Sequence, residues 1–164
     1  MAASSTQRRL SGKEAGAMNS HVQVFHGSMH QTQIEKTLRD LDGFVSSCND
    51  FKKVPKTLQW KTCRKRAWNF CASIQRLRVV AVGFDLDTYQ EILGMLERFE
   101  HLASDAIQYA RFHGQKITKN DRVASVRSRC RIRIKQVRNN IKNTQVQLEA
   151  KKRYEEELSS LFDR

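Results

Sequence analysis

Apolar residues recur at alternating spacings of three and four along four stretches of this chain, which is the repeat of an amphipathic α-helix. The first stretch includes Ile34, Leu38 and Leu41, and the later stretches keep the same alternation. Turn-forming residues such as Pro55 and Gly114 separate the stretches. We therefore predict helices over residues 32–48, 57–82, 87–112 and 120–162.

These helices predict an all-α fold, and we expect a four-helix bundle that forms one domain over residues 29–164. Residues 1–28 are rich in Ser, Gly, Gln and Ala without apolar periodicity, so we predict a disordered tail there. Thr32 with Glu35 three residues later forms a capping box that predicts the start of the first helix. Asp87 or Thr88 is expected to cap the third.

The fourth predicted helix is long compared with the others. At 1.5 Å per residue it spans roughly 64 Å, against roughly 39 Å for the second and third. Its C-terminal third is therefore expected to project, to bend back or to form a coiled coil with another chain. Residues 149–164 either continue this helix or fold back onto its basic side. Residues 127–135 also alternate as in a strand, but the helical spacing continues on both sides, so we favour a helix.

Electric charge is distributed along the chain in blocks, and the formal net charge is +13. Residues 51–80 contain nine Lys or Arg and no acid, and residues 111–148 contain eleven with a single acid, Asp121. Residues 81–110 contain six acids and one base, Arg98. Because these acids are too few to neutralise both basic blocks, the pattern indicates a polyanionic partner such as nucleic acid or an anionic membrane.

Placement at 100° per residue gathers the basic residues onto faces of the predicted helices. The candidate nucleic-acid-binding residues are Lys61, Arg64, Lys65 and Trp68 on the second predicted helix, and Arg127, Arg131, Lys135, Arg138 and Lys142 on the fourth. A further group of Arg122, Arg129 and Arg133 lies on the other flank of the fourth helix. Trp68 is the candidate for stacking on an unpaired base. Alternatively, it packs against the tail or the first helix with Arg64 on its ring.

Patterns typical of catalysis or of a bound cofactor do not occur in the sequence. It contains no phosphate-binding Gly-rich loop, no Gly-x-Ser-x-Gly turn and no His-Glu-x-x-His. His26 and His30 have the spacing of metal ligands but fall in the predicted tail, so we expect no metal site. Glu97, His101 and Asp105 stack on the outer face of the third predicted helix, where we expect surface ion pairs rather than a proton relay.

The four cysteines lack the spacings of a zinc site or of a disulfide framework. Arg8 and Arg9 precede no apolar run, so we expect no secretory signal. No stretch reaches the ~18 apolar residues that a membrane-spanning helix needs. We therefore expect reduced thiols beside the core and an intracellular protein, either cytoplasmic or nuclear.

Together these features predict a non-enzymatic helical protein that binds nucleic acid, with RNA or another single strand favoured as the partner. Self-association through the long fourth helix is part of this hypothesis, and no cofactor is predicted. The alternative is a helical interaction module whose basic ridges contact an acidic protein or an anionic membrane surface.

Overall fold

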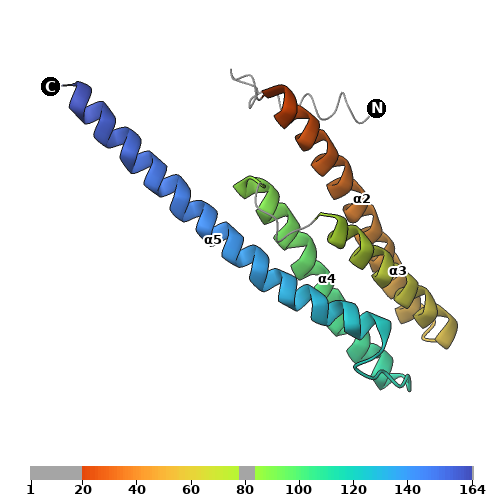
Figure 1. The fold of residues 1–164 in the computed structure, drawn as a ribbon. Coiled ribbons are helices and arrows are strands. Elements are labelled where there is room, and N and C mark those ends of the chain that lie inside the picture. Colours follow the sequence, from red (N-terminus) through yellow and green to blue (C-terminus); the bar gives the residue numbers. More distant parts are fainter. Residues whose placement is uncertain (1–19, 78–83, 164) are drawn as a thin grey trace.

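A computed structural model describes residues 20–77 and 84–163, with side chains described from residue 31 onward. Its helices are α2 (Ser20–Lys53), α3 (Thr57–Arg76), α4 (Leu86–Phe112) and α5 (Arg122–Phe162), and the described residues include no strand (Figure 1). The all-α prediction is therefore confirmed. Residues 127–135, whose alternation also suited a strand, lie within α5 and confirm the helix prediction there.

The first helix starts earlier than its capping box predicts. α2 begins at Ser20 rather than near Thr32, and residues 1–19 of the predicted tail lie outside the described part of the chain. No proline interrupts the sequence between Ser20 and Thr32, so the helix continues through the predicted start. Within it, the carboxylate of Glu35 accepts a hydrogen bond from the side chain of Gln31 at 3.2 Å.

The ends of α3 and α4 also differ from the prediction. α3 ends at Arg76, and the predicted continuation over residues 78–82 lies outside the described part of the chain. α4 is capped by Asp85, whose carboxylate accepts a hydrogen bond from the backbone N–H of Thr88 at 2.8 Å. The prediction of Asp87 or Thr88 as the cap was wrong because Asp85, two residues before Asp87, has the same capping ability and is the residue at the start of the helix.

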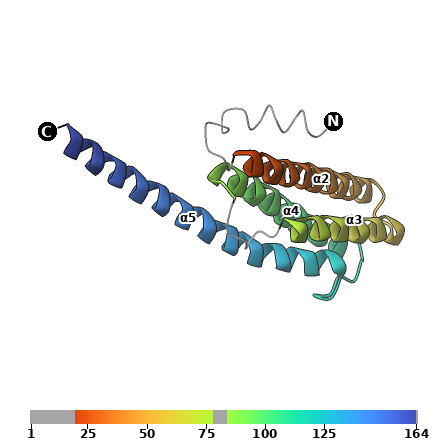
Figure 2. The same cartoon turned by 45° about the horizontal axis from the view of Figure 1, so that its top comes forward.

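The helices form a bundle in which α2 packs along α3 and α4 packs along α5 (Figures 1 and 2). Smaller contacts of α3 with α5 and of α2 with α4 join the two pairs. At the centre, the ring of Phe70 stacks on that of Phe99 with centroids 4.7 Å apart, and the ring of Phe44 lies 4.4 Å from that of Phe99. These fully buried rings join α2, α3 and α4 in one core.

All four cysteines are buried in this core and none forms a disulfide, as expected of small apolar residues. A hydrogen bond with Cys63 and burial raise the pKa of the Cys48 thiol. Burial likewise raises the pKa of Cys130 to about 12. These two thiols are therefore protonated and unreactive at neutral pH.

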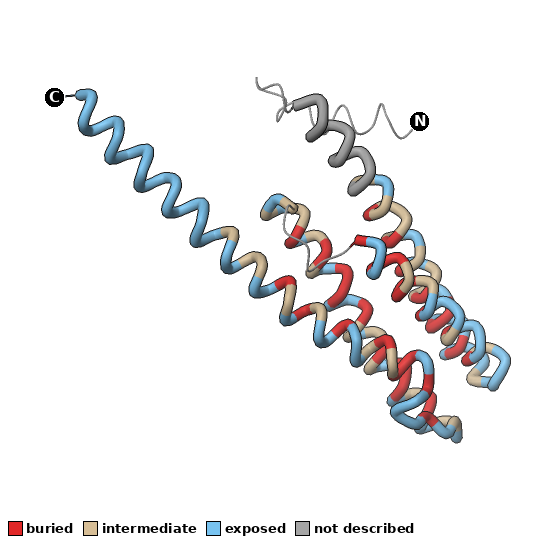
Figure 3. The backbone as a smooth tube through the Cα atoms, in the orientation of Figure 1, coloured by how far each residue is buried: buried red, intermediate tan, exposed pale blue. Residues whose placement is uncertain are grey.

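α5 extends well beyond the bundle. Its buried residues lie between Val123 and Val137, and Ile141 still packs partly against the core. From Gln145 to Asp163 every residue is exposed (Figure 3). Of the outcomes left open by the sequence, the last part of the chain thus continues α5 as a projecting helix and does not fold back onto its basic side.

Candidate nucleic-acid interface

The buried carboxylate of Asp121 joins the start of α5 to α3. Its Oδ1 accepts a hydrogen bond from the backbone N–H of Val123 at 2.9 Å, which caps the N-terminus of α5. Its Oδ2 accepts hydrogen bonds from Trp60 Nε1 at 3.1 Å and from Arg64 Nε at 2.8 Å. Because the Asp121 side chain is only 3% exposed, these donors replace the water that would otherwise solvate its charge.

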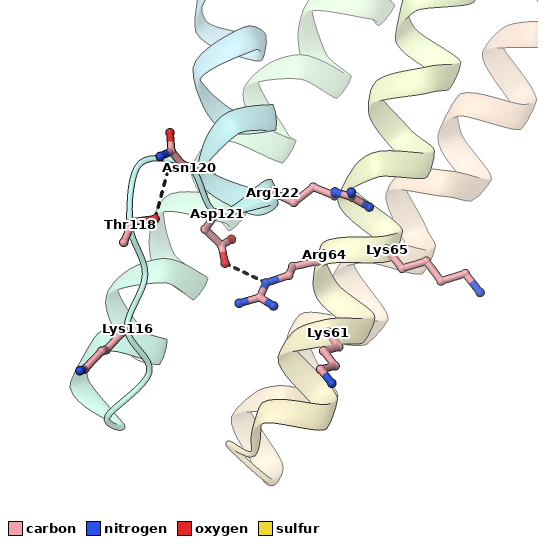
Figure 4. Close-up of a pocket in the computed structure, with 8 residues that line it drawn as sticks. All are labelled: Lys61, Arg64, Lys65, Lys116, Thr118, Asn120, Asp121 and Arg122. Atoms are coloured by element: carbon pink, nitrogen blue, oxygen red, sulfur yellow. Dashed lines mark hydrogen bonds and ion pairs between the residues drawn. The ribbon is translucent and has the colours of Figure 1, made fainter.

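Beside this contact lies a pocket of about 530 Å³, formed by α3, the α4–α5 loop and the start of α5 (Figure 4). Its lining residues are Lys61, Arg64, Lys65, Lys116, Thr118, Asn120, Asp121 and Arg122. Among these described residues Asp121 is the only acid, and both of its oxygens already accept hydrogen bonds. The five cations therefore leave an excess of positive charge for a bound anion.

The α4–α5 loop that carries Lys116 is held by its own contacts. Gly114 adopts a left-handed backbone conformation with φ of 83°, which ends α4 and favours glycine at this position. The Arg111 guanidinium donates hydrogen bonds to the carbonyl of Ile117 at 2.9 and 3.2 Å. Lys116 is thereby placed at the edge of the pocket, opposite the cations of α3 (Figure 4).

Trp68 continues the same face toward the middle of the bundle. Its side chain is 44% exposed, and the guanidinium carbons of Arg122 and Arg129 lie 5.2 and 5.8 Å from its ring centroid. The alternative in which Arg64 lies on this ring is wrong, because Arg64 instead bonds Asp121. The structure thus places two arginines of α5 within cation–π distance of an exposed aromatic ring.

The predicted ridge on α5 lies against α4. We define the α5 ridge as the five candidate residues Arg127, Arg131, Lys135, Arg138 and Lys142. Arg131 Nε lies 2.8 Å from an oxygen of Glu100, and Arg138 Nη2 lies 2.8 Å from an oxygen of Glu97. Acids of the 81–110 block therefore neutralise part of the ridge.

The other members of the α5 ridge differ in exposure. Arg127 is partly buried, and burial together with the charge of Arg131 lowers the pKa of its guanidinium. Lys135 and Lys142 are exposed, and Lys142 lies just before the projecting part of α5. This leaves less free charge on the ridge than the sequence indicated.

The nine predicted site residues are therefore divided between two surfaces. Around the axis of α5, Arg122 and Arg129 lie roughly opposite Arg131, with the buried stripe of the helix between them. We define the basic face as Lys61, Arg64, Lys65, Trp68, Lys116, Arg122 and Arg129. The sequence grouped Arg122 with Arg129 but did not assign them to the site, and it missed Lys116, which lies in a loop without periodicity.

The acid–histidine–acid series on α4 does not form a relay. Glu97 pairs with Arg138, and Asp105 lies 2.6 Å from Lys52 of α2. Both carboxylates thus form ion pairs with neighbouring helices at the surface. Among the described residues, no group of three or more His, Cys, Asp or Glu side chains is arranged to hold a metal ion.

Comparison of this chain with protein-family models, with curated proteins and with solved structures finds no match. Within the described ranges, none of the helices combines the length and the apolar character required to cross a membrane.

We expect Asp121→Ala to lower the free energy of unfolding by about 2–4 kcal/mol, because it removes a helix cap and leaves the buried Trp60 N–H unpaired. Urea denaturation followed by circular dichroism measures this loss. The control Asp42→Ala removes an exposed carboxylate 3.8 Å from Arg98 and is expected to cost less than about 0.5 kcal/mol. Equal effects of the two substitutions would contradict the structural role of Asp121.

Proposed function

We propose that this protein is a non-enzymatic helical protein that binds single-stranded nucleic acid, with RNA favoured, through its basic face. The observation that carries the proposal is the exposed ring of Trp68 within cation–π distance of Arg122 and Arg129, next to a pocket with five cations. Cations bind phosphates without regard to sequence, whereas an exposed aromatic ring adds stacking on a base. Stacking requires an unpaired base, which favours a single strand over a duplex.

The cation–π contacts suggest how the face accepts a strand. A base that stacks on Trp68 takes the place of a guanidinium on the ring, and the displaced Arg122 or Arg129 then contacts the adjacent phosphate. Phosphates on one side of the base reach Lys61 and Lys65 on α3. The α5 ridge serves as a secondary contact, since Glu97 and Glu100 already pair with two of its arginines.

Self-association through α5 is a further part of this proposal. Beyond Ile141 the helix keeps apolar residues that no part of the described chain covers, including Leu148, Leu158 and Phe162. A second helix with a coiled-coil-like seam would bury them.

We expect replacement of Lys61, Lys65 and Arg122 by Gln to weaken binding of a fluorescently labelled oligouridylate. The slope of log affinity against log salt should become shallower by about 2, since each phosphate contact on a single strand contributes about 0.7. Fluorescence anisotropy across a salt series measures both quantities. The matched control replaces Arg131, Lys135 and Arg138 by Gln and removes the same charge, so an equal loss in the control would contradict the assignment to the basic face.

Trp68 gives a direct optical test of base stacking. Binding of the unlabelled oligouridylate should quench tryptophan fluorescence through Trp68, because Trp60 is fully buried and bonded to Asp121. Trp68→Phe should abolish the quenching, and Trp68→Ala should weaken affinity by about 5- to 150-fold, the equivalent of one lost stacking contact. Quenching that persists in Trp68→Phe would show that the strand binds elsewhere.

One observation favours the alternative of an anionic membrane surface. Leu58 and Phe112 are 71% and 87% exposed, and Val54 is also exposed, at an end of the bundle that carries Lys53 and Lys56. The α4–α5 loop meets the start of α3 at this end, where the side chain of Gln115 bonds that of Thr57 at 3.4 Å. Apolar side chains beside lysines are typical of peripheral membrane contact.

The two functions are separated by substitutions that lie outside the basic face. If the membrane alternative holds, Leu58→Ser together with Phe112→Ser should reduce co-sedimentation with vesicles containing phosphatidylserine, while oligouridylate affinity stays unchanged. Vesicles of phosphatidylcholine alone are the control for charge. Co-sedimentation that is absent from the parent protein, or unaffected by the double substitution, would leave no support for membrane contact at this end.

A further inference from the structure

The exposed part of α5 continues the apolar seam of the bundle, but two charged residues interrupt it. Counting onward from Ile141 by alternating steps of three and four, the seam positions are Thr144, Leu148, Lys151, Glu155, Leu158 and Phe162. At 100° per residue these positions share one side of the helix. Leu148, Leu158 and Phe162 are 51%, 36% and 85% exposed, so the described chain leaves this side open.

The charges on this segment are arranged in a way that a single helix does not favour. A base four residues before an acid, as Lys151 before Glu155, is the less favourable order for a pair within one helix. The ion pair that the structure shows here joins Arg153 to Glu149 at 3.8 Å, on the side opposite the seam. The seam charges are therefore free to meet a partner.

We propose that the partner is a second copy of this chain, whose α5 packs antiparallel with a two-fold axis at the level of Arg153. Residues equally far before and after Arg153 then face each other. Lys151 of each copy meets Glu155 of the other, so both interruptions of the seam are paired. A parallel arrangement places Lys151 against Lys151 and Glu155 against Glu155, which is unfavourable.

The apolar positions match in the same arrangement. Leu148 of each copy faces Leu158 of the other, and Phe162 faces Thr144, which is half-buried at the edge of the bundle. The shared segment runs from residue 144 to 162, about 28 Å of helix, and lies beyond Ile141, the last residue of α5 that packs on the core. The two bundles therefore lie at opposite ends of a shared helix pair and do not obstruct each other.

This arrangement rests on the proposed self-association and does not depend on nucleic-acid binding. The residues involved lie outside the basic face, so oligouridylate affinity can be measured on the same variants. Failure of the helix pairing and failure of nucleic-acid binding are thus distinguishable.

Charge reversal tests the proposed contact in the full chain. Sedimentation velocity over a concentration series should show a dimer of the parent protein, and Lys151→Glu or Glu155→Lys should each weaken it by about tenfold or more. The two changes combined in one chain should restore the dimer. The controls Arg153→Glu and Glu157→Lys make the same charge changes away from the seam and should leave it intact. Circular dichroism checks that helicity is retained.

Two results would overturn the proposal in different ways. If the parent protein stays monomeric at every concentration reached, the protein does not self-associate and the proposal is wrong. A dimer that is unaffected by Lys151→Glu and Glu155→Lys retains self-association but excludes this contact.

Cysteine pairing tests the antiparallel direction. The native cysteines are buried, so a cysteine introduced on the projecting part of α5 is the exposed thiol. Leu148→Cys and Leu158→Cys chains are mixed and oxidised, and the antiparallel pair should form disulfides between unlike chains only. Disulfides between like chains would show a parallel pair, and no disulfide at all would show that these positions do not meet; either result contradicts the proposal.

Discussion

A buried carboxylate must be fully hydrogen-bonded, and this requirement at Asp121 determines how α5 begins. Its donors come from Val123 at the start of α5 and from Trp60 and Arg64 on α3, two segments about sixty residues apart in the sequence. The hydrogen bonds to Asp121 hold α3 and the start of α5 side by side at one end of the bundle. The cations of both helices are consequently brought to the same surface, and the only acid in the described lining of that surface is turned inward.

The orientation of α5 gives its two basic flanks different surroundings. Once its apolar stripe is buried, the flank with Arg131 and Arg138 faces acids of α4 and forms ion pairs. The opposite flank, with Arg122 and Arg129, faces α3, where it meets an aromatic ring and further lysines. Arginines that look equivalent in the sequence therefore differ in how much of their charge is available to a partner.

The apolar periodicity of the sequence predicts which side of each helix is buried, but not which neighbouring helix packs against that side. The start of α3 and both ends of α4 and α5 were predicted to within two residues, because the apolar spacing of a helix that packs on a core is regular along its length. The start of α2 was predicted wrongly, because Thr32 and Glu35 form a capping pattern inside a continuous helix. The composition of the basic face was predicted only in part, because the bond between Trp60 and Asp121 is long-range and Lys116 lies in a loop without a repeat.

The length of α5 has a consequence for how a bound strand would be engaged. From Arg122 to the level of Arg153 the helix rises about 46 Å, so an antiparallel pair holds its two basic faces roughly 90 Å apart. If the proposed dimer binds nucleic acid as proposed, a short oligonucleotide would reach one face at a time, whereas a long strand would reach both and gain avidity from the second contact. In the proposed dimer the projecting helix would act as a spacer that favours long strands over short ones, whatever their sequence.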